Sequence, residues 1–221
     1  MPSSCRGCAA LGQPSLARPP GTRARLSSDR REQLETTGRL LRDLGHDVVD
    51  VKIDYGMASL RNATTRYLNG VRDDVATLPT QHLLEARTRA VARLARLTPP
   101  RSLRRAIRRE HIVATSMNCV FDNCDVIVTP LFESPAPRVT QCPTRGALRS
   151  LRASNTSAWL IPWNVSGQPA IAVPTGIGSD SLPTSVQFVG PAGGEALLLH
   201  LASQMECTRP FVQWLSSTTV D

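Results

Sequence analysis

The sequence has very little lysine and few aromatic residues. Lys52 is the only lysine among 26 basic residues, and Phe, Trp and Tyr together make up 4% of the 221 residues. A core must therefore be built mainly from Leu, Val, Ile and Ala. No apolar run approaches the ~18 residues of a transmembrane helix, and no apolar segment typical of a secretory signal follows the first residues. These absences predict a globular protein of the cytosol that does not enter a membrane.

The sequence also lacks the spacing of a metal site or of a disulfide framework. Its six cysteines are irregularly spaced, and in the cytosol they are expected to be reduced thiols. Cys5 and Cys8 have the C-x-x-C spacing of half a zinc site, but such a site needs two further ligands. No second pair follows, and the four histidines stand singly. We therefore expect neither a metal nor a cofactor.

The net charge of +8 comes almost entirely from arginine. Either selection for phosphate binding or a GC-rich coding genome explains this bias, and we favour the second. Residues 56–118 predict three helices, and nine arginines lie from Arg87 to Arg109. Such helices could bind nucleic-acid phosphates, but no aromatic residue between Gln81 and Val120 offers a base a stacking surface. We therefore favour a solvated outer face over a nucleic-acid site.

The two ends of the chain are interpreted as tails. Residues 1–25 contain four prolines, four arginines and no acidic residue, a composition that predicts disorder. An arginine-rich start is also typical of a mitochondrial presequence, but the prolines oppose the amphipathic helix that such a sequence forms. Residues 208–221 carry no pattern. The folded domain is therefore expected over residues 26–207.

The domain should begin with a helix, a turn and a strand. The helix is expected from Asp29, with Glu32 placed as in a capping box, to a C-terminal cap at Gly45. Alternation over Val48–Ile53 then indicates a strand. This order is typical of a layered α/β sheet.

Residues 125–207 predict the remaining strands. Pro162, Pro169 and Pro174 each lack a backbone donor, so they should lie at strand ends, edges or turns. Gly167 and Gly176 suit turns that need a positive φ. Apolar or alternating runs bounded by Pro or Gly indicate the strands. The expected elements are the strands Val126–Val128, Ala170–Val173 and Val186–Val189 and a helix over Glu195–Met205.

In this order and spacing, the pieces resemble the C-terminal part of the amidase signature family, serine hydrolases that include acetamidase-like and glutamyl-tRNA amidotransferase enzymes. Residues 29–53 match more loosely, as a helix and a strand. The resemblance implies an α/β fold with a mixed sheet and surrounding helices. It also implies hydrolysis of a carboxylic acid amide, through a serine ester, to an acid and ammonia or an amine. The matching words are D-V-I-V-T-P at 125–130, P-W-N at 162–164, G-Q-P-A at 167–170, V-P-x-G at 173–176, L-P at 182–183 and V-Q-x-V-G-P at 186–191, then Glu195 to Glu206.

The family's catalytic residues are missing from this sequence. The family uses a serine nucleophile, a second serine and a lysine, with the serines in a Gly- and Ser-rich stretch. Here Lys52 stands in V-V-D-V-K-I-D-Y, and no glycine flanks any of the three Ser-Ser pairs. A serine nucleophile needs a base and oxyanion donors, and the sequence supplies neither. We therefore expect no catalytic residue, an incomplete sheet, and a truncated amidase that is inactive alone.

Two alternatives stay open. The chain is either a binding or assembly subunit that completes a separate catalytic chain, or an arginine-rich nucleic-acid binder, which is the less favoured of the two. On the truncation hypothesis, a small-molecule amide binds only if a complementary amidase chain supplies the catalytic half.

By the resemblance, the loop over residues 131–157 covers the substrate entrance, and Trp159, Trp163 and Asn164 are candidates to line it. Packing of both indoles beside the sheet is the alternative that we favour, and for Asn164 we favour hydrogen bonds that anchor a turn. Ser181 and Ser185 stand where the family usually has glycine. If either position needs a positive φ, a serine there costs on the order of 1 kcal/mol.

Overall fold

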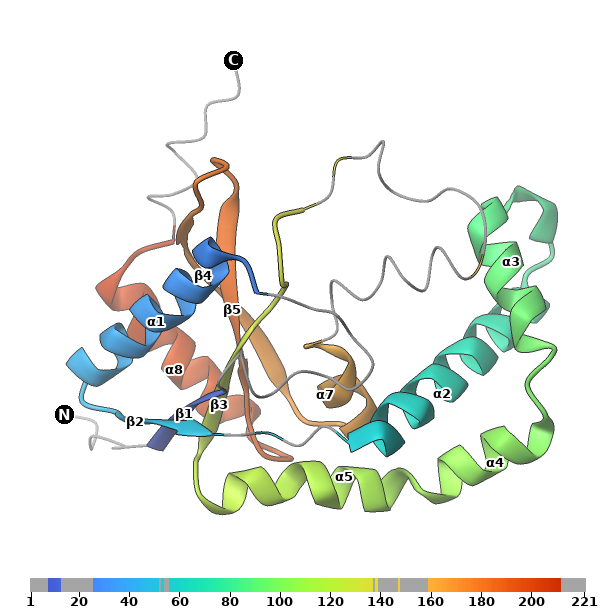
Figure 1. Ribbon diagram of the computed structural model, residues 1–221, viewed down its shortest axis with the longest axis horizontal. Coiled ribbons are helices and arrows are strands. Elements are labelled where there is room, and N and C mark those ends of the chain that lie inside the picture. The colour runs from blue at the N-terminus through green and yellow to red at the C-terminus, as the bar shows by residue number, and fades with distance from the viewer. Residues whose placement is uncertain are drawn as a thin grey trace.

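The chain folds around a mixed five-stranded sheet that packs against helices on both faces (Figure 1). The computed structural model describes residues 8–12, 26–51, 53, 56–136, 138, 147 and 159–211. The α/β class expected from the sequence is confirmed. In their order across the sheet, the strands are β2 (Asp47–Val51), β1 (Cys8–Gly12), β3 (Val126–Pro130), β5 (Pro183–Val189) and β4 (Ala170–Ile177).

β1 shows that the prediction of a disordered tail over residues 1–25 was wrong for residues 8–12. The strand runs parallel to β2, with Cys8 opposite Asp47, and parallel to β3, with Ala9 opposite Val126. It therefore lies inside the sheet rather than outside the domain. Five residues, C-A-A-L-G, are too few to show a hydrophobic period, and strand formation here depends on two partners that are distant in the sequence.

The three later strands form where the sequence predicted them, and each is longer than expected. Pro174 lies within β4 rather than at its end. β4 is the last strand of the sheet, an edge position where a proline is tolerated. Its register with β5 shifts between Pro174 and Gly176, and Gly176 has a φ of +142°. The predicted edge proline and positive-φ glycine are thus confirmed at one irregularity of the sheet.

α1 (Ser28–Asp43) begins one residue before the predicted Asp29. Its N-cap is Ser27, which has extended backbone angles and accepts a hydrogen bond from the Arg30 N–H at 3.4 Å. Asp29 is the acidic residue of the first turn, where a negative charge complements the helix dipole. The predicted start was close, but the wrong side chain was chosen as the cap.

α1 ends as predicted, at Gly45. This glycine has a φ of +89°, and its N–H donates to the Arg42 carbonyl at 2.9 Å. The next N–H, of His46, donates to the Leu41 carbonyl at 3.0 Å. These two bonds form a Schellman motif, which satisfies carbonyls at the end of the helix. The turn leads directly into β2.

α1 and α8 (Glu195–Thr208) lie on one face of the sheet (Figure 1). Leu41 of α1 and Phe188 of β5 are fully buried, and Phe211 packs against the same cluster. The second tail therefore does not begin at residue 208, since α8 ends there and the chain still contacts the core at Phe211. The other buried members of the cluster are Leu34, Val48, Val126, Val128, Val173, Val186, Leu198, Leu201 and Met205.

Residues 56–118 form four α-helices rather than the predicted three: α2 (Gly56–Thr77), α3 (Ala86–Ala95), α4 (Pro100–Arg108) and α5 (Glu110–Asn118). The expected third helix is divided at Arg109, which has φ −94° and ψ 0°. Arginines three and four residues apart repel one another along α4, and each half is fixed by its own buried residues, Ala106 in α4 and Val113 in α5. Leu83, expected in the second helix, lies in a 3₁₀ turn before it.

Candidate functional site

The residues predicted at the substrate entrance lie on α7 (Ile161–Ser166) and just before it. Pro162 occupies the first turn of this helix, where the missing N–H has no helical partner to lose. Gly167 ends the helix with a φ of +78°, and its N–H donates to the Trp163 carbonyl at 3.0 Å. The sequence P-W-N-V-S-G thus sets both ends of a short helix beside the sheet.

Trp159 and Trp163 are each 1% exposed and pack in one cluster with Ile127 of β3 and Val189 of β5. The ring of Phe121 is tilted at 56° to that of Trp163, with 6.4 Å between their centroids, a favourable aromatic geometry. α5 contributes Val113 and Met117 to the same cluster. Both indoles therefore have the packing role that we favoured from the sequence.

Asn164 is exposed on α7. The structure places this residue and the two tryptophans within residues 159–164, at and just before the start of α7. Most of the loop over residues 131–157 lies outside the described residues, so a role of these three side chains at a substrate entrance stays a prediction.

A buried polar pair, Thr129 and Gln187, lies on the same face of the sheet. Thr129 is 1% exposed, Gln187 is 6% exposed, and the two are directly opposite on β3 and β5. The Thr129 hydroxyl donates to Gln187 Oε1 at 3.2 Å. Alternation along the strands places them on the side of Ile127 and Val189, which the tryptophans cover. Sequence reasoning did not select this pair, and its signal was weak: Thr129 follows the apolar run Val126–Val128, and Gln187 lies between apolar residues of β5.

The β4–β5 hairpin turns between Gly178 and Leu182. The Gly178 N–H donates to the Leu182 carbonyl at 2.8 Å, and the Ser181 N–H donates to the Gly178 carbonyl at 3.0 Å. Ser181 has a φ of +62°, the only positive φ of a non-glycine residue in the described ranges. Ser185 lies within β5 and has no positive φ. Of the two serines for which the sequence resemblance suggested a glycine position, only Ser181 therefore occupies a conformation that favours glycine.

Asp29 ties the start of α1 to this hairpin. The hydroxyl and the N–H of Ser179 donate to Asp29 Oδ2 at 2.5 Å and 3.1 Å. These two hydrogen bonds, that of the hydroxyl first, hold the pKa of Asp29 below its ordinary value. Burial instead raises the pKa of Glu133, which follows β3 and whose carbonyl accepts a hydrogen bond from the Ser27 N–H at 2.9 Å. Asp29 thus stabilises the joint between helix and hairpin in its charged form.

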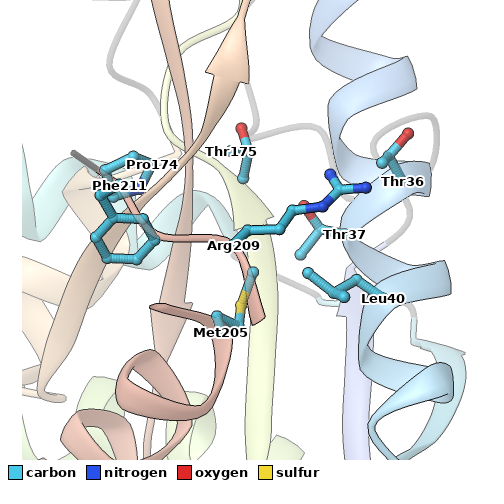
Figure 2. A pocket seen from close by; sticks show the side chains of 8 residues that line it. All are labelled: Thr36, Thr37, Leu40, Pro174, Thr175, Met205, Arg209 and Phe211. Carbon is cyan, nitrogen blue, oxygen red and sulfur yellow. The ribbon is translucent and has the colours of Figure 1, made fainter. Parts of the chain in front are cut away.

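A small hollow lies between α1, β4 and the residues that follow α8 (Figure 2). In this view the Arg209 side chain extends across the hollow toward Thr36 and Thr37 of α1. The cavity volume is about 10 Å³, which is room for one water molecule at most. This hollow is therefore too small for an amide substrate.

In the described ranges, no group of three or more His, Cys, Asp or Glu side chains is placed to hold a metal ion. Among the helices that the structure describes, none is long and apolar enough to span a membrane. Among the described residues, Cys119, Cys124 and Cys207 form no disulfide.

Comparison with known proteins decides the family. The sequence model of the amidase family matches residues 16–199. The chain belongs to the amidase family. Its amidase relatives include the Mycobacterium tuberculosis protein named "Putative amidase AmiB2", which is 39% identical over 175 residues, 79% of this chain and 38% of the relative. "Putative amidase AmiA2" of the same organism is 32% identical over 205 residues, 89% of this chain and 42% of the relative.

Solved structures of amidase-family enzymes have the same fold. The structure of 6-aminohexanoate cyclic dimer hydrolase complexed with substrate superposes with a TM-score of 0.77 at 24% identity, over 94% of this chain and 46% of that chain. This confirms the α/β amidase fold expected from the sequence words at 125–206. The chain spans about two fifths of the length of the curated amidases that it matches.

The amidase match includes both Trp159 and Trp163, Thr129 and Gln187, and the hairpin with Ser181. It does not place a nucleophile. Of the three Ser-Ser pairs, the described one is Ser27-Ser28, where Ser27 acts as the N-cap of α1. Lys52 and the other two pairs lie outside the described residues.

Proposed function

We propose that this chain takes part in hydrolysis of a carboxylic acid amide to an acid and ammonia or an amine, as the C-terminal part of an amidase. The supporting observation is its 39% identity with the relative "Putative amidase AmiB2" across 175 residues. In such a reaction a serine oxygen attacks the amide carbon, the amine leaves with a proton, and water then hydrolyses the serine ester.

In this proposal the chain supplies structure rather than the nucleophile. The residues of the Trp159–Trp163 cluster and the Thr129–Gln187 pair form one packed face, and Asn164 stands exposed beside it. Hydroxyl and amide groups can orient a substrate or a neighbouring segment, but they do not provide the base that an attacking serine needs. We therefore propose that the chain is inactive alone, and that a small-molecule amide binds when a complementary amidase part provides the serines and the lysine.

A second candidate function is that of an assembly subunit for a separate catalytic chain. The observation that favours it is the position of β2 and β4, which are the end strands of the sheet in the part of the chain that the structure describes. An end strand presents N–H and C=O groups that another chain can pair with. We also propose a cytosolic location, supported by Cys119 and Cys207, which form no disulfide with another described residue, and cell fractionation tests it.

The experiment compares the chain alone with a mixture. The full chain is expressed by itself and together with the portion of the AmiB2 relative that the alignment does not cover. Release of ammonia from acetamide, benzamide and hexanamide is followed over hours, with amine release from 6-aminohexanoate cyclic dimer as a fourth arm. We expect no turnover by the chain alone and turnover in the mixture, with the AmiB2 portion alone as the control.

Two results would contradict the proposal. Turnover by the chain alone, above a heat-inactivated sample and abolished by replacing one of its serines, would show that a nucleophile is present here. A mixture that forms a stable complex but hydrolyses none of the four amides would favour the non-catalytic assembly role instead.

A further inference from the structure

The helical segment of this protein carries a large excess of positive charge. Residues 56–118 contain twelve arginines and four acidic residues, a net charge of +8. Residues 1–25 add four arginines and no acidic residue, whereas residues 26–55 and 119–221 together contain ten basic and fourteen acidic residues, a net charge of −4. Solvation alone does not require the arginines to be concentrated in one segment.

Three of them converge on a hollow between α2, α4 and α5, which we name the α2–α4–α5 pocket. Its volume is about 310 Å³, within the range of small-molecule sites. α2 contributes Arg61, Asn62 and Thr65, α4 contributes Ser102 and Arg105, and Arg109 lies at the junction of α4 and α5. Ala106 and Val113, both buried, complete the lining. No acidic side chain is among the lining residues.

Three of the four acidic residues of the segment form ion pairs away from the pocket. Glu110 pairs with Arg66 at 2.9 Å, and Asp73 pairs with Arg72 at 2.7 Å. Glu85 pairs with Arg87. In the described part of the chain, none of these carboxylates bonds to Arg61, Arg105 or Arg109, so the three guanidinium groups around the pocket keep their donors for another anion.

Asn62 adds a buried acceptor at the same place. Its side chain is 5% exposed, and its Nδ2 donates to the Ala106 carbonyl at 2.7 Å, which fixes the orientation of the amide. Its Oδ1 has no hydrogen-bond partner among the described residues. A buried acceptor without a donor is unfavourable, and a hydroxyl group of a ligand in the pocket would satisfy it.

We propose that the α2–α4–α5 pocket binds a small hydroxylated organic phosphate. Guanidinium groups form paired, charge-assisted hydrogen bonds with phosphate oxygens, and three of them match a phosphate dianion better than a singly charged carboxylate. Ser102 and Thr65 add hydroxyl donors. The ligand's own hydroxyl donates to Asn62 Oδ1.

A nucleic acid fits these residues less well. Recognition of single strands relies on stacking against aromatic side chains, and no aromatic residue lines the pocket. Duplex binding spreads phosphate contacts along a surface, whereas here one concave site gathers three arginines. The site shares Val113 with the cluster around Trp159 and Trp163, but none of its polar residues belongs to that cluster, so its role does not depend on the amide hydrolysis proposed above.

The test uses the full chain and isothermal titration calorimetry with glycerol 3-phosphate, with methyl phosphate as the ligand that lacks a hydroxyl. The pocket variant is Arg105→Gln with Arg109→Gln. The matched control is Arg101→Gln with Arg104→Gln, which removes the same charge from the same helical region at positions that do not line the pocket. Circular dichroism checks that each variant keeps the helical content of the parent, as expected for exposed side chains.

We expect saturable one-site binding of glycerol 3-phosphate that weakens at least about tenfold in the pocket variant, because two charge-assisted hydrogen-bond partners are lost. The affinity of the control variant for glycerol 3-phosphate should stay within about threefold of the parent's. Its arginines do not line the pocket, and salt screens their long-range effect on the ligand. Methyl phosphate should bind more weakly than glycerol 3-phosphate.

Three outcomes would overturn the proposal, and a fourth would overturn its hydroxyl contact. Undetectable binding of both phosphates would show that the pocket holds no such ligand. An equal loss of affinity in the pocket variant and the control variant would show that the ligand responds only to the overall positive charge. Tighter binding of a 20-base-pair DNA duplex, weakened equally by both variants, would identify a nucleic-acid surface instead. Equal affinity for the two phosphates would remove the part assigned to Asn62 Oδ1.

Discussion

Replacing Ser181 with glycine should stabilise the protein. Ser181 holds a φ of +62° at the tip of the β4–β5 hairpin, where an L-residue with a Cβ pays about 1–2 kcal/mol. Glycine removes this strain, but its greater conformational entropy in the unfolded chain reduces the stabilisation by about 0.4–1 kcal/mol. The net stabilisation of Ser181→Gly is therefore about 0.5–1 kcal/mol, which for a domain of this size is about 1–4 °C in Tm.

The matched control is Ser185→Gly, at the other serine that stands where the amidase family usually has glycine. Ser185 lies in β5 opposite Pro174 of β4 and has no positive φ, so glycine there should destabilise the strand by about 0.5–1 kcal/mol. Urea unfolding followed by circular dichroism, with thermal melts, measures both changes. A Ser181→Gly variant that is no more stable than the parent, or that changes in the same direction as Ser185→Gly, would refute the strain argument.

Two further predictions concern contacts that hold the sheet and helices together. Asp29→Asn should lower the free energy of unfolding at neutral pH and make it depend less on acid pH: the folded-state pKa of Asp29 is below its ordinary value, so its stabilisation is present at neutral pH and is lost as the pH falls through the ordinary aspartate range toward the lower folded pKa. The difference in urea midpoint between parent and Asp29→Asn should therefore be larger at pH 7 than at pH 3, with Glu32→Gln as the control in the same helix. Thr129→Val should cost about 1–3 kcal/mol because buried Gln187 Oε1 loses its donor. The double variant Thr129→Val with Gln187→Met should recover part of this loss. If its loss in free energy of unfolding equals the sum of the losses of the two single variants, the two side chains are not coupled.

Local signals in the sequence predicted the elements that carry the family resemblance. Pro and Gly punctuation located β3, β4 and β5, and the resemblance of residues 125–206 anticipated the amidase fold. Gly45 was predicted as a helix cap and Gly167 as a turn residue with a positive φ, because a left-handed backbone conformation is a local requirement. The short helix α7 that Gly167 ends was not predicted. The doubt raised over Ser181 was well placed for the same reason.

Long-range pairing explains what the sequence did not predict. β1 is stabilised by ladders to β2 and β3, which lie ~35 and ~115 residues further along the chain, and no five-residue pattern can indicate such partners. The Thr129–Gln187 pair likewise depends on the register between β3 and β5. The division of the third helix at Arg109 follows from packing of Ala106 and Val113 on separate neighbours, which a continuous helical period conceals.

The segregation of charge gives the fold two regions that should respond independently to substitution. The strands β3, β4 and β5 with α7 and α8 lie within residues 126–208, whereas the α2–α4–α5 pocket draws its arginines from residues 61–109. The two regions meet where α5 and α7 pack, through Val113 and Met117 against Trp163, an apolar contact that contains none of the pocket arginines. Substitutions at distant sites without shared partners are additive to within about 0.5 kcal/mol. Arg105→Gln and Arg109→Gln should therefore leave the effect of Ser181→Gly on stability unchanged, because no hydrogen bond or ion pair described here joins the hairpin to the pocket.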